Sequence, residues 1–188
     1  MATLRSLCVY CGSRLGDEPR YKEAAETLGT ALAKEKVRLV FGGGKQGLMG
    51  VTAETVRDAG GEVLGIIPNF LTETEGAVDG IELIRVETMH ERKDIMFHQC
   101  DAVCVLPGGI GTLEETIEVL SWASLKLHKK PIIICNIGGY WDPLVTLIDH
   151  ILDDGFGYPG LREDITVVTC ADDVIPAARR QMKTNEEA

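Results

Sequence analysis

The sequence predicts an α/β fold, a doubly wound and mostly parallel sheet flanked by helices in a single domain. Short apolar runs rich in β-branched residues alternate with segments of helical spacing along the whole chain, which is typical of βα units around a parallel sheet. The 188 residues, 45% of them hydrophobic, suffice for one sizeable core and are too few for two. We assign residues 1–182 to this domain and expect the polar tail 183–188 to be disordered.

The apolar runs predict strands whose nearly continuous apolar content suits burial on both faces. They are Leu4 to Tyr10, Val37 to Phe41, Glu62 to Ile67, Ala102 to Leu106, Pro131 to Asn136 and Ile165 to Thr169, with an additional short strand left open at Ile81 to Val86. Helical spacing predicts helices over Tyr21 to Glu35, Gly47 to Ala59, Met89 to Gln99, Thr112 to Leu127, Pro143 to Leu152 and Asp172 to Met182. The segment Pro68 to Gly80 lacks clear periodicity, so we expect a mobile loop near the site.

Charge and composition exclude several classes of partner. A net charge of -10 disfavours a nucleic-acid partner, because phosphate backbones are bound by basic residues. No apolar run approaches the ~20 residues that cross a bilayer, and the start lacks a secretory leader, so we expect a cytoplasmic protein without a membrane partner. The six cysteines are interpreted as buried hydrophobes, since the CxxC of Cys8 and Cys11 has no second pair. The histidines are scattered without ligand spacing, so we expect no metal and no cofactor.

Glycine-rich or polar loops follow four of the predicted strands. They contain Gly12-Ser13, Gly42-Gly43-Gly44, Pro68-Asn69 and Pro107-Gly108-Gly109. Ligands of open parallel sheets bind beyond the carboxyl ends of the strands. The sequence therefore predicts a ligand site at one edge of the sheet, where Ser13 can donate a hydrogen bond to a phosphate.

Gly42, Gly44 and Gly47 match the GxGxxG pattern of dinucleotide-binding folds. An acid at the end of the next strand would hold the ribose of NAD, but Glu62 falls at the beginning of that strand. Leu48 stands where an ATPase phosphate loop has lysine. The pattern disfavours NAD and ATPase chemistry, and a tight glycine turn remains an alternative.

The stretch LPGGIGTLEE, residues 106–115, permits two interpretations. Its glycines allow close approach to a ligand, and the helix predicted from Thr112 directs free N–H groups towards an anion. Thr112 and Glu115 also have the spacing of a capping box, in which Glu115 would bond to the helix start. Spacing alone does not separate a capping role for Glu115 from a catalytic one.

Three segments together resemble the Lonely Guy family of cytokinin-activating phosphoribohydrolases: PGGIGTLEE at 107–115, MHERK at 89–93 and GGGKQGLMG at 42–50. The likeness extends from VYCGS at 9–13 to GGYWDPL at 138–144. The resemblance implies a Rossmann-like fold, a homodimer, and hydrolysis of the N-glycosidic bond of cytokinin riboside 5'-monophosphates, AMP or both. Relatives are often labelled lysine decarboxylases, although nothing in this sequence requires a pyridoxal cofactor.

The family pattern PGGxGTxxE implies that Glu115 is the catalytic carboxylate and Arg92 its basic companion. A substrate-contacting glutamate of plant members aligns near Phe70, where the loop is longer here, so the base preference stays open. Ser121 stands where plant members have a binding threonine. The substrate-binding residues that we expect are Lys93, Gly108, Gly109, Gly111, Thr112, Ser121, Ser13, Gly43, Gly44 and Met49.

The chemistry of the reaction suits these residues. Cleavage between ribose and purine develops positive charge on the sugar, which a carboxylate stabilises, or the carboxylate activates water. Arg92 lies in the first turn of its helix, where a cation is mildly disfavoured, so a functional partner or a solvated surface position would explain it. A non-catalytic nucleotide-binding or cofactor-carrier protein of the same fold remains the alternative. The joint presence of Arg92 and Glu115 favours hydrolysis, because a carrier needs only the glycine loops.

Overall fold

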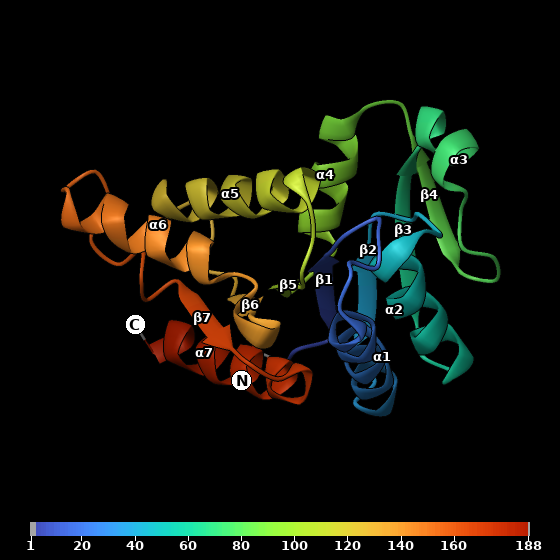
Figure 1. Ribbon diagram of the computed structural model, residues 1–188, viewed down its shortest axis with the longest axis horizontal. Coiled ribbons are helices and arrows are strands. Elements are labelled where there is room, and N and C mark those ends of the chain that lie inside the picture. Colours follow the sequence, from blue (N-terminus) through green and yellow to red (C-terminus); the bar gives the residue numbers. More distant parts are fainter. Residues whose placement is uncertain (1–2, 188) are drawn as a thin grey trace.

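The computed structural model describes residues 3–187, and these contain one sheet of seven strands that pair in parallel. Its spatial order is β4-β3-β2-β1-β5-β6-β7 (Figure 1). The predicted parallel sheet is confirmed, and the strand left open at 81–86 forms as β4. The strands are β1 (Ser6–Tyr10), β2 (Arg38–Phe41), β3 (Val63–Pro68), β4 (Glu82–Val86), β5 (Ala102–Val105), β6 (Ile132–Cys135) and β7 (Ile165–Val168).

Helices cover both faces of the sheet (Figure 1). One face carries α1 (Pro19–Lys34), α2 (Gly47–Asp58) and α7 (Val174–Glu187), and the other carries α4 (Met89–His98), α5 (Ile110–Ser124) and α6 (Asp142–Asp153). A short helix, α3 (Asn69–Glu75), follows β3 near the β4 edge.

The two faces hold separate cores because side chains alternate along each strand. Leu7 and Val9 of β1 pack into the core under α1, α2 and α7. Cys8 and Tyr10 of the same strand pack into the core under α4, α5 and α6. All four are almost fully buried, which explains why the strands are apolar throughout.

The side on which the chain adds strands changes between β1 and β5. From β1 the chain builds outward to β4, then returns to place β5 on the other side of β1. The register pairs Tyr10 with Val105, so the two strands end level with each other. Their following loops therefore open side by side, at the position where such sheets bind ligands.

The segment 68–80 was predicted as a loop, and this is wrong for residues 69–75, which form α3. Pro68 precedes the helix with φ -65°, the angle that the pyrrolidine ring fixes in advance. Seven residues with no buried side chain give no detectable apolar period. Its end is bound to the loop after β2, because Gln46 Nε2 donates to the carbonyl oxygen of Thr74 at 3.0 Å.

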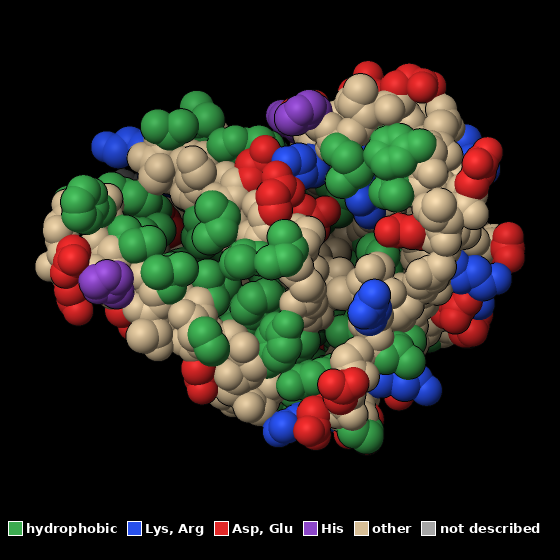
Figure 2. Space-filling model, turned by 45° about the horizontal axis from the view of Figure 1, so that its top comes forward, with side chains coloured by type: hydrophobic (Ala, Val, Ile, Leu, Met, Phe, Trp, Pro, Cys, Tyr) green, Lys and Arg blue, Asp and Glu red, His purple; other side chains and the backbone are tan. Residues whose placement is uncertain are grey.

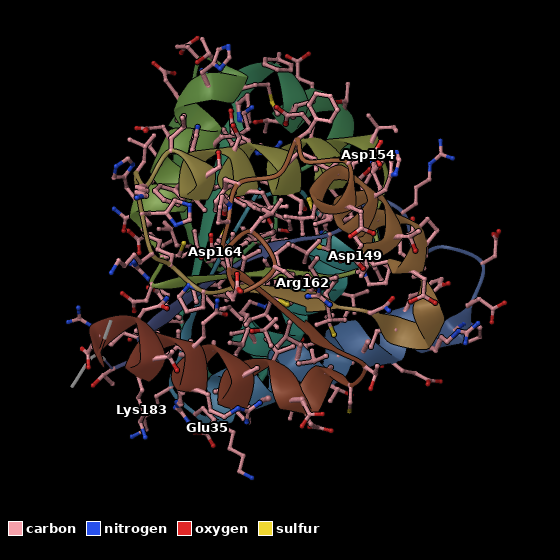
Figure 3. The ribbon with its side chains drawn as sticks, turned by 90° about the vertical axis from the view of Figure 1, so that its left-hand side faces the viewer. Glu35, Asp149, Asp154, Arg162, Asp164 and Lys183 are labelled. Carbon is pink, nitrogen blue, oxygen red and sulfur yellow. The ribbon has the colours of Figure 1, made fainter. Side chains whose placement is uncertain are left out.

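The tail was also predicted incorrectly, since α7 continues through Glu187. Asn185 Nδ2 donates to the carbonyl oxygen of Lys129 at 2.6 Å, which attaches the last turns to the segment before β6. Lys183 extends from this helix (Figure 3). Polar residues sustain a helix when one side of it packs, so polarity did not mean disorder here. Ala188 lies outside the described residues.

The segment between α6 and β7 is held by polar contacts (Figure 3). Arg162 Nε lies 3.3 Å from Oδ1 of Asp149 on α6, and the Tyr158 hydroxyl donates to the carboxylate of Asp164. These contacts stabilise the segment, which lies at the opposite end of the molecule from α3 (Figure 1).

All six cysteines are free thiols, and five of them are buried, as the sequence predicted for small hydrophobes. Cys170 is the exposed one. Between residues 3 and 187, no helix has both the length and the apolar character needed to cross a membrane.

Candidate active site

Three loops meet at the carboxyl edge of the sheet. Gly12 N donates to the carbonyl oxygen of Pro107 at 3.0 Å, and Leu48 N donates to that of Gly12 at 3.0 Å. A Cβ on Gly12 would lie 3.3 Å from Cα of Gly108, so a side chain there would press the loops apart. Gly47 has φ +59° and no space for a Cβ, which would lie 2.3 Å from the Arg14 nitrogen. The second glycine loop, which follows β2 and contains Gly42 to Gly47, is thus a tight turn that allows the loops to approach closely.

A cavity of about 210 Å³ opens where these loops face α4 and α5. Both predicted catalytic residues, Arg92 and Glu115, line it. Of the predicted substrate-binding residues, it brings together Ser13, Met49, Gly109, Gly111 and Thr112, and the remaining lining residues are Cys11, Glu75, Met89, Ile110 and Glu114. A neighbouring hollow of about 510 Å³ shares Ser13, Gly109 and Ile110 with it.

The N-terminus of α5 faces this cavity without a side-chain cap. The helix begins at Ile110 after Gly109 as N-cap, two residues before the predicted start, and no side chain of the described chain caps it. The first-turn N–H groups have no partner within a helix, so they remain available to an anion. A Cβ on Gly109 or Gly111 would meet no atom within 4 Å, so open space adjoins these N–H groups.

Glu115 is not a capping residue. It is the sixth residue of α5, beyond the third helical position that a capping box requires. The capping box in this region belongs to α4, where Thr88 and Glu91 form it. Burial raises the pKa of the Glu115 carboxyl to about 7, although the charge of Arg92 opposes this rise. Glu115 is therefore present in both protonation states near neutral pH.

Arg92 is a buried residue with an exposed fraction of 6%, so its interpretation as a surface arginine is wrong. Its Nη2 donates to the carbonyl oxygen of Gly42 at 2.8 Å, and Nη1 lies 3.8 Å from Sδ of Met89. Its Nε is buried and has no hydrogen-bond partner among residues 3–187. Arg92 attracts Glu115 electrostatically rather than through a bidentate pair, since the salt bridges of the described chain do not join them.

Glu75, at the end of α3, is a site residue that sequence reasoning missed. It lines the cavity, and its Oε2 is buried without a hydrogen-bond partner in the described part of the chain. The same oxygen would lie 2.7 Å from a Cβ on Gly44, so that glycine makes room for it. No motif marked Glu75, because it lies in the segment without periodicity. The alignment of the plant glutamate near Phe70 pointed to this segment but not to this residue.

Several predicted binding residues do not line the cavity. Lys93 is buried beside it, with Nζ 2.5 Å from Oε1 of Glu114 and 3.1 Å from Oε1 of Glu118. Gly43 has φ +78° and packs against Ile67, which makes it a turn residue. Gly108 lines the neighbouring hollow, Gly44 adjoins Glu75, and Ser121 is exposed on α5. The binding roles of Lys93, Gly43, Gly44, Gly108 and Ser121 stay predictions.

A larger groove of about 630 Å³ lies between α1 and α7, but we place the site at the smaller cavity. Perturbed and unpartnered ionisable groups converge there, which is the physical mark of a functional site. Among the described residues, His, Cys, Asp and Glu form no group of three that could hold a metal ion. The expectations of no metal and no cofactor stay predictions.

Comparisons with known proteins identify the family of the chain. The family model described as "Possible lysine decarboxylase" matches residues 49–178. The chain is 43% identical over 172 residues to the cytokinin riboside 5'-monophosphate phosphoribohydrolase LOG7 of Arabidopsis thaliana, spanning 91% of this chain and 79% of the relative. It is 46% identical over 159 residues to the probable cytokinin riboside 5'-monophosphate phosphoribohydrolase LOGL9 of Oryza sativa subsp. japonica, spanning 84% and 70%.

Solved structures share the fold. The molybdenum cofactor binding protein of Rippkaea orientalis superposes with a TM-score of 0.72 at 20% identity, covering 97% of this chain and 99% of that chain. The molybdenum cofactor carrier protein of Chlamydomonas reinhardtii gives 0.70 at 20% identity, covering 96% and 99%. These likenesses confirm the Rossmann-like fold. On the family model and the plant relatives, the chain belongs to the Lonely Guy family, whose model is described as possible lysine decarboxylase.

Proposed function

We propose that this protein hydrolyses the N-glycosidic bond of cytokinin riboside 5'-monophosphates, AMP or both, and releases the free base and ribose 5-phosphate. One observation carries the proposal. Arg92, with a buried and unpartnered Nε, shares a cavity with Glu115, whose pKa burial raises to about 7, and the uncapped start of α5 lies beside them. The names of the plant relatives support the same reaction.

The 5'-phosphate of the nucleotide binds at the start of α5, where N–H groups and the helix dipole favour an anion. The ribose then lies along the first turns of α5, which bring Glu115 to the bond that breaks. Met49 and Met89 offer polarisable surface to the base. The unpartnered Oε2 of Glu75 accepts a hydrogen bond from an N–H of the base or a ribose hydroxyl.

In the reaction, the bond from C1' of ribose to the base nitrogen breaks, and its electron pair leaves with the base. Ionised Glu115 stabilises the positive charge that develops on the sugar and accepts a proton from the attacking water, whose oxygen bonds to C1'. That proton then passes to the departing base. Arg92 lowers the pKa of Glu115 against the effect of burial, which keeps a fraction of the carboxylate ionised at neutral pH. Phosphate binding orients the reacting atoms.

The alternative is a carrier that binds a nucleotide or cofactor without hydrolysis. The two solved structures are named as molybdenum cofactor proteins, but at 20% identity they inform only on the fold. A phosphate cradle does not need the carboxyl of pKa about 7 that lies beside the buried arginine, because backbone N–H groups suffice to form it. This favours the hydrolase.

Incubation with AMP and with isopentenyladenosine monophosphate, followed by chromatography, tests the proposal. We expect free adenine or isopentenyladenine, together with an equal amount of ribose 5-phosphate. Adenosine serves as the matched control and should release far less base, because it lacks the phosphate that α5 binds. Binding of both monophosphates without release of base would support the carrier instead.

We further propose that the protein forms a homodimer through the side built by α5 and α6. Figure 2 shows apolar side chains gathered over this half of the molecule. Ile117 of α5 and Leu147 of α6 are 44% and 50% exposed, and Phe156, just after α6, is 87% exposed. Glutamate at both Ile117 and Leu147 should yield a monomer in light scattering, whereas Phe70→Glu, an exposed apolar position on α3, should leave the dimer intact.

The remaining proposals concern partners and location. We propose no nucleic-acid partner, because the net charge of -10 opposes binding to a phosphate backbone. We also propose a cytoplasmic location, which the six free thiols support, since thiols persist in reducing compartments.

A further inference from the structure

An ion cluster built around the buried Lys93 joins α4 to α5 beside the cavity. The Lys93 side chain is 8% exposed, and its Nζ lies 2.5 Å from Oε1 of Glu114 and 3.1 Å from Oε1 of Glu118. The residues next to this cluster in sequence are the two predicted catalytic groups. Arg92 precedes Lys93 on α4, and Glu115 follows Glu114 on α5.

The two carboxylates of the cluster differ in position. Glu114 lines the cavity and is 53% exposed, whereas Glu118 lies one turn further along α5, is 25% exposed and does not line the cavity. Residues four apart on a helix share a face, so both point at α4. Because Glu118 lies outside the cavity, it acts on the reaction through the position of Lys93 and through its own charge rather than by contact with the substrate.

We propose that Glu118 is a positioning residue for hydrolysis: with Glu114 it holds Lys93, and this contact fixes Arg92 of α4 relative to Glu115 of α5. The inference deepens the proposed function and rests on it. The less exposed Glu118 is the stronger anchor, because water screens an exposed ion pair more than a shielded one. Without Glu118, Lys93 would keep only the more exposed Glu114 as a partner, and the contact that holds α4 against α5 would weaken.

The charge state of the cluster supports this role. Burial alone would lower the pKa of the Lys93 ammonium, but its hydrogen bonds to Glu114 and Glu118 outweigh burial and raise that pKa. Lys93 is therefore charged at neutral pH. A buried ammonium that loses one partner is left partly uncompensated, so the contact resists separation of the two helices.

The charge of Glu118 also affects the pKa of Glu115, together with the other charged groups around this carboxyl. Arg92 and Lys93 lower the pKa of Glu115, whereas Glu114 and Glu118 raise it, beneath the dominant effect of burial. The loss of the Glu118 charge therefore lowers the pKa of Glu115. The other titratable groups around this carboxyl are Glu75 and Cys11 at the cavity and Tyr10 and Cys8 on β1.

The test compares Glu118→Gln with Glu23→Gln, which removes an exposed carboxylate from α1. Two readouts are taken: kcat and KM for AMP, and the pKa of Glu115 from a carbon NMR titration, with its signal assigned by its loss in Glu115→Gln. For Glu118→Gln we expect kcat to fall roughly tenfold with little change in KM, because a small displacement of the reacting groups slows the chemical step. We also expect a lower pKa of Glu115. Glu23→Gln should match the wild type in both.

Two further variants keep the result decisive. Glu118→Asp retains the charge but is one methylene too short, so it should lower kcat while the pKa of Glu115 stays near that of the wild type. In a Lys93→Met background, Glu118→Gln should add little further loss, because Lys93 transmits the effect. Fully additive losses, or a Glu118→Gln enzyme with wild-type kcat and an unchanged pKa of Glu115, would overturn the inference. The NMR titration needs no turnover, so an inactive wild type would refute the proposed function separately.

Discussion

Arg92 donates from Nη2 to the carbonyl oxygen of Gly42 at 2.8 Å, across 50 positions of sequence. This bond joins α4 to the loop after β2 and fixes one end of the guanidinium. It leaves Nε buried and without a partner within residues 3–187. An arginine fixed in this way presents a preorganised donor to a ligand, because its rotamer is already determined before the substrate arrives.

Gly42→Ala should therefore impair the enzyme although it removes no catalytic side chain. A Cβ at this position would lie 1.8 Å from Nη2 of Arg92, so the guanidinium must move. We expect kcat/KM to fall by about two orders of magnitude, as for displacement of a catalytic group by roughly 1 Å. Steady-state kinetics measure this, with circular dichroism to show that the fold persists. Because both changes act through Arg92, the loss should not add to that of Arg92→Lys.

The glycines of the phosphate loop should respond differently to alanine. A Cβ on Gly108 would lie 2.6 Å from the Cβ of buried Thr112, so Gly108→Ala should destabilise the fold by about 1–3 kcal/mol in urea unfolding. A Cβ on Gly111 meets no atom within 4 Å. Gly111→Ala should therefore fold normally but bind AMP more weakly in calorimetry, since the methyl group occupies space beside the anion. Unchanged AMP binding in Gly111→Ala would place the phosphate elsewhere.

The raised pKa of Glu115 predicts a pH-dependent stability. Folding raises this pKa from 4.5 to about 7, so the folded state favours the protonated carboxyl. This contribution is fully present below pH 4.5 and is lost as the pH rises through 7. Between pH 5 and 8 the wild type should lose up to about 3 kcal/mol of unfolding free energy relative to Glu115→Gln, which does not titrate. Urea unfolding of both proteins at several pH values measures the difference, and a constant difference would show that the pKa is ordinary.

The pattern of apolar residues sufficed to predict the sheet and the carboxyl edge at which its loops meet, because parallel strands buried on both faces are apolar throughout. It failed where an element is short or polar. α3 has seven residues and no buried side chain, and the last turns of α7 are polar, so neither displays an apolar stripe. Such segments form because tertiary contacts, such as that between Asn185 and Lys129, stabilise them.

The site was predictable to the extent that motifs mark it. Glu115 and Arg92 were found through their motifs, and the structure brings both to one cavity. The sequence alone could not exclude a capping role for Glu115. That role is excluded only because the helix starts at Ile110 rather than Thr112. Glu75 was missed because its approach depends on backbone contacts between the segment after α3 and the second glycine loop, such as Val78 N to Gly43 O at 3.4 Å.

The central claim is that Glu115 carries out hydrolysis of a nucleoside 5'-monophosphate, and the kcat of Glu115→Gln tests it most directly. Glutamine preserves the shape of the side chain but can neither ionise nor accept a proton from water. We predict that the variant binds AMP about as tightly as the wild type in calorimetry and releases base at least roughly a hundredfold more slowly, within the range for loss of a general base. Base release at a near wild-type rate by the folded variant would contradict the account.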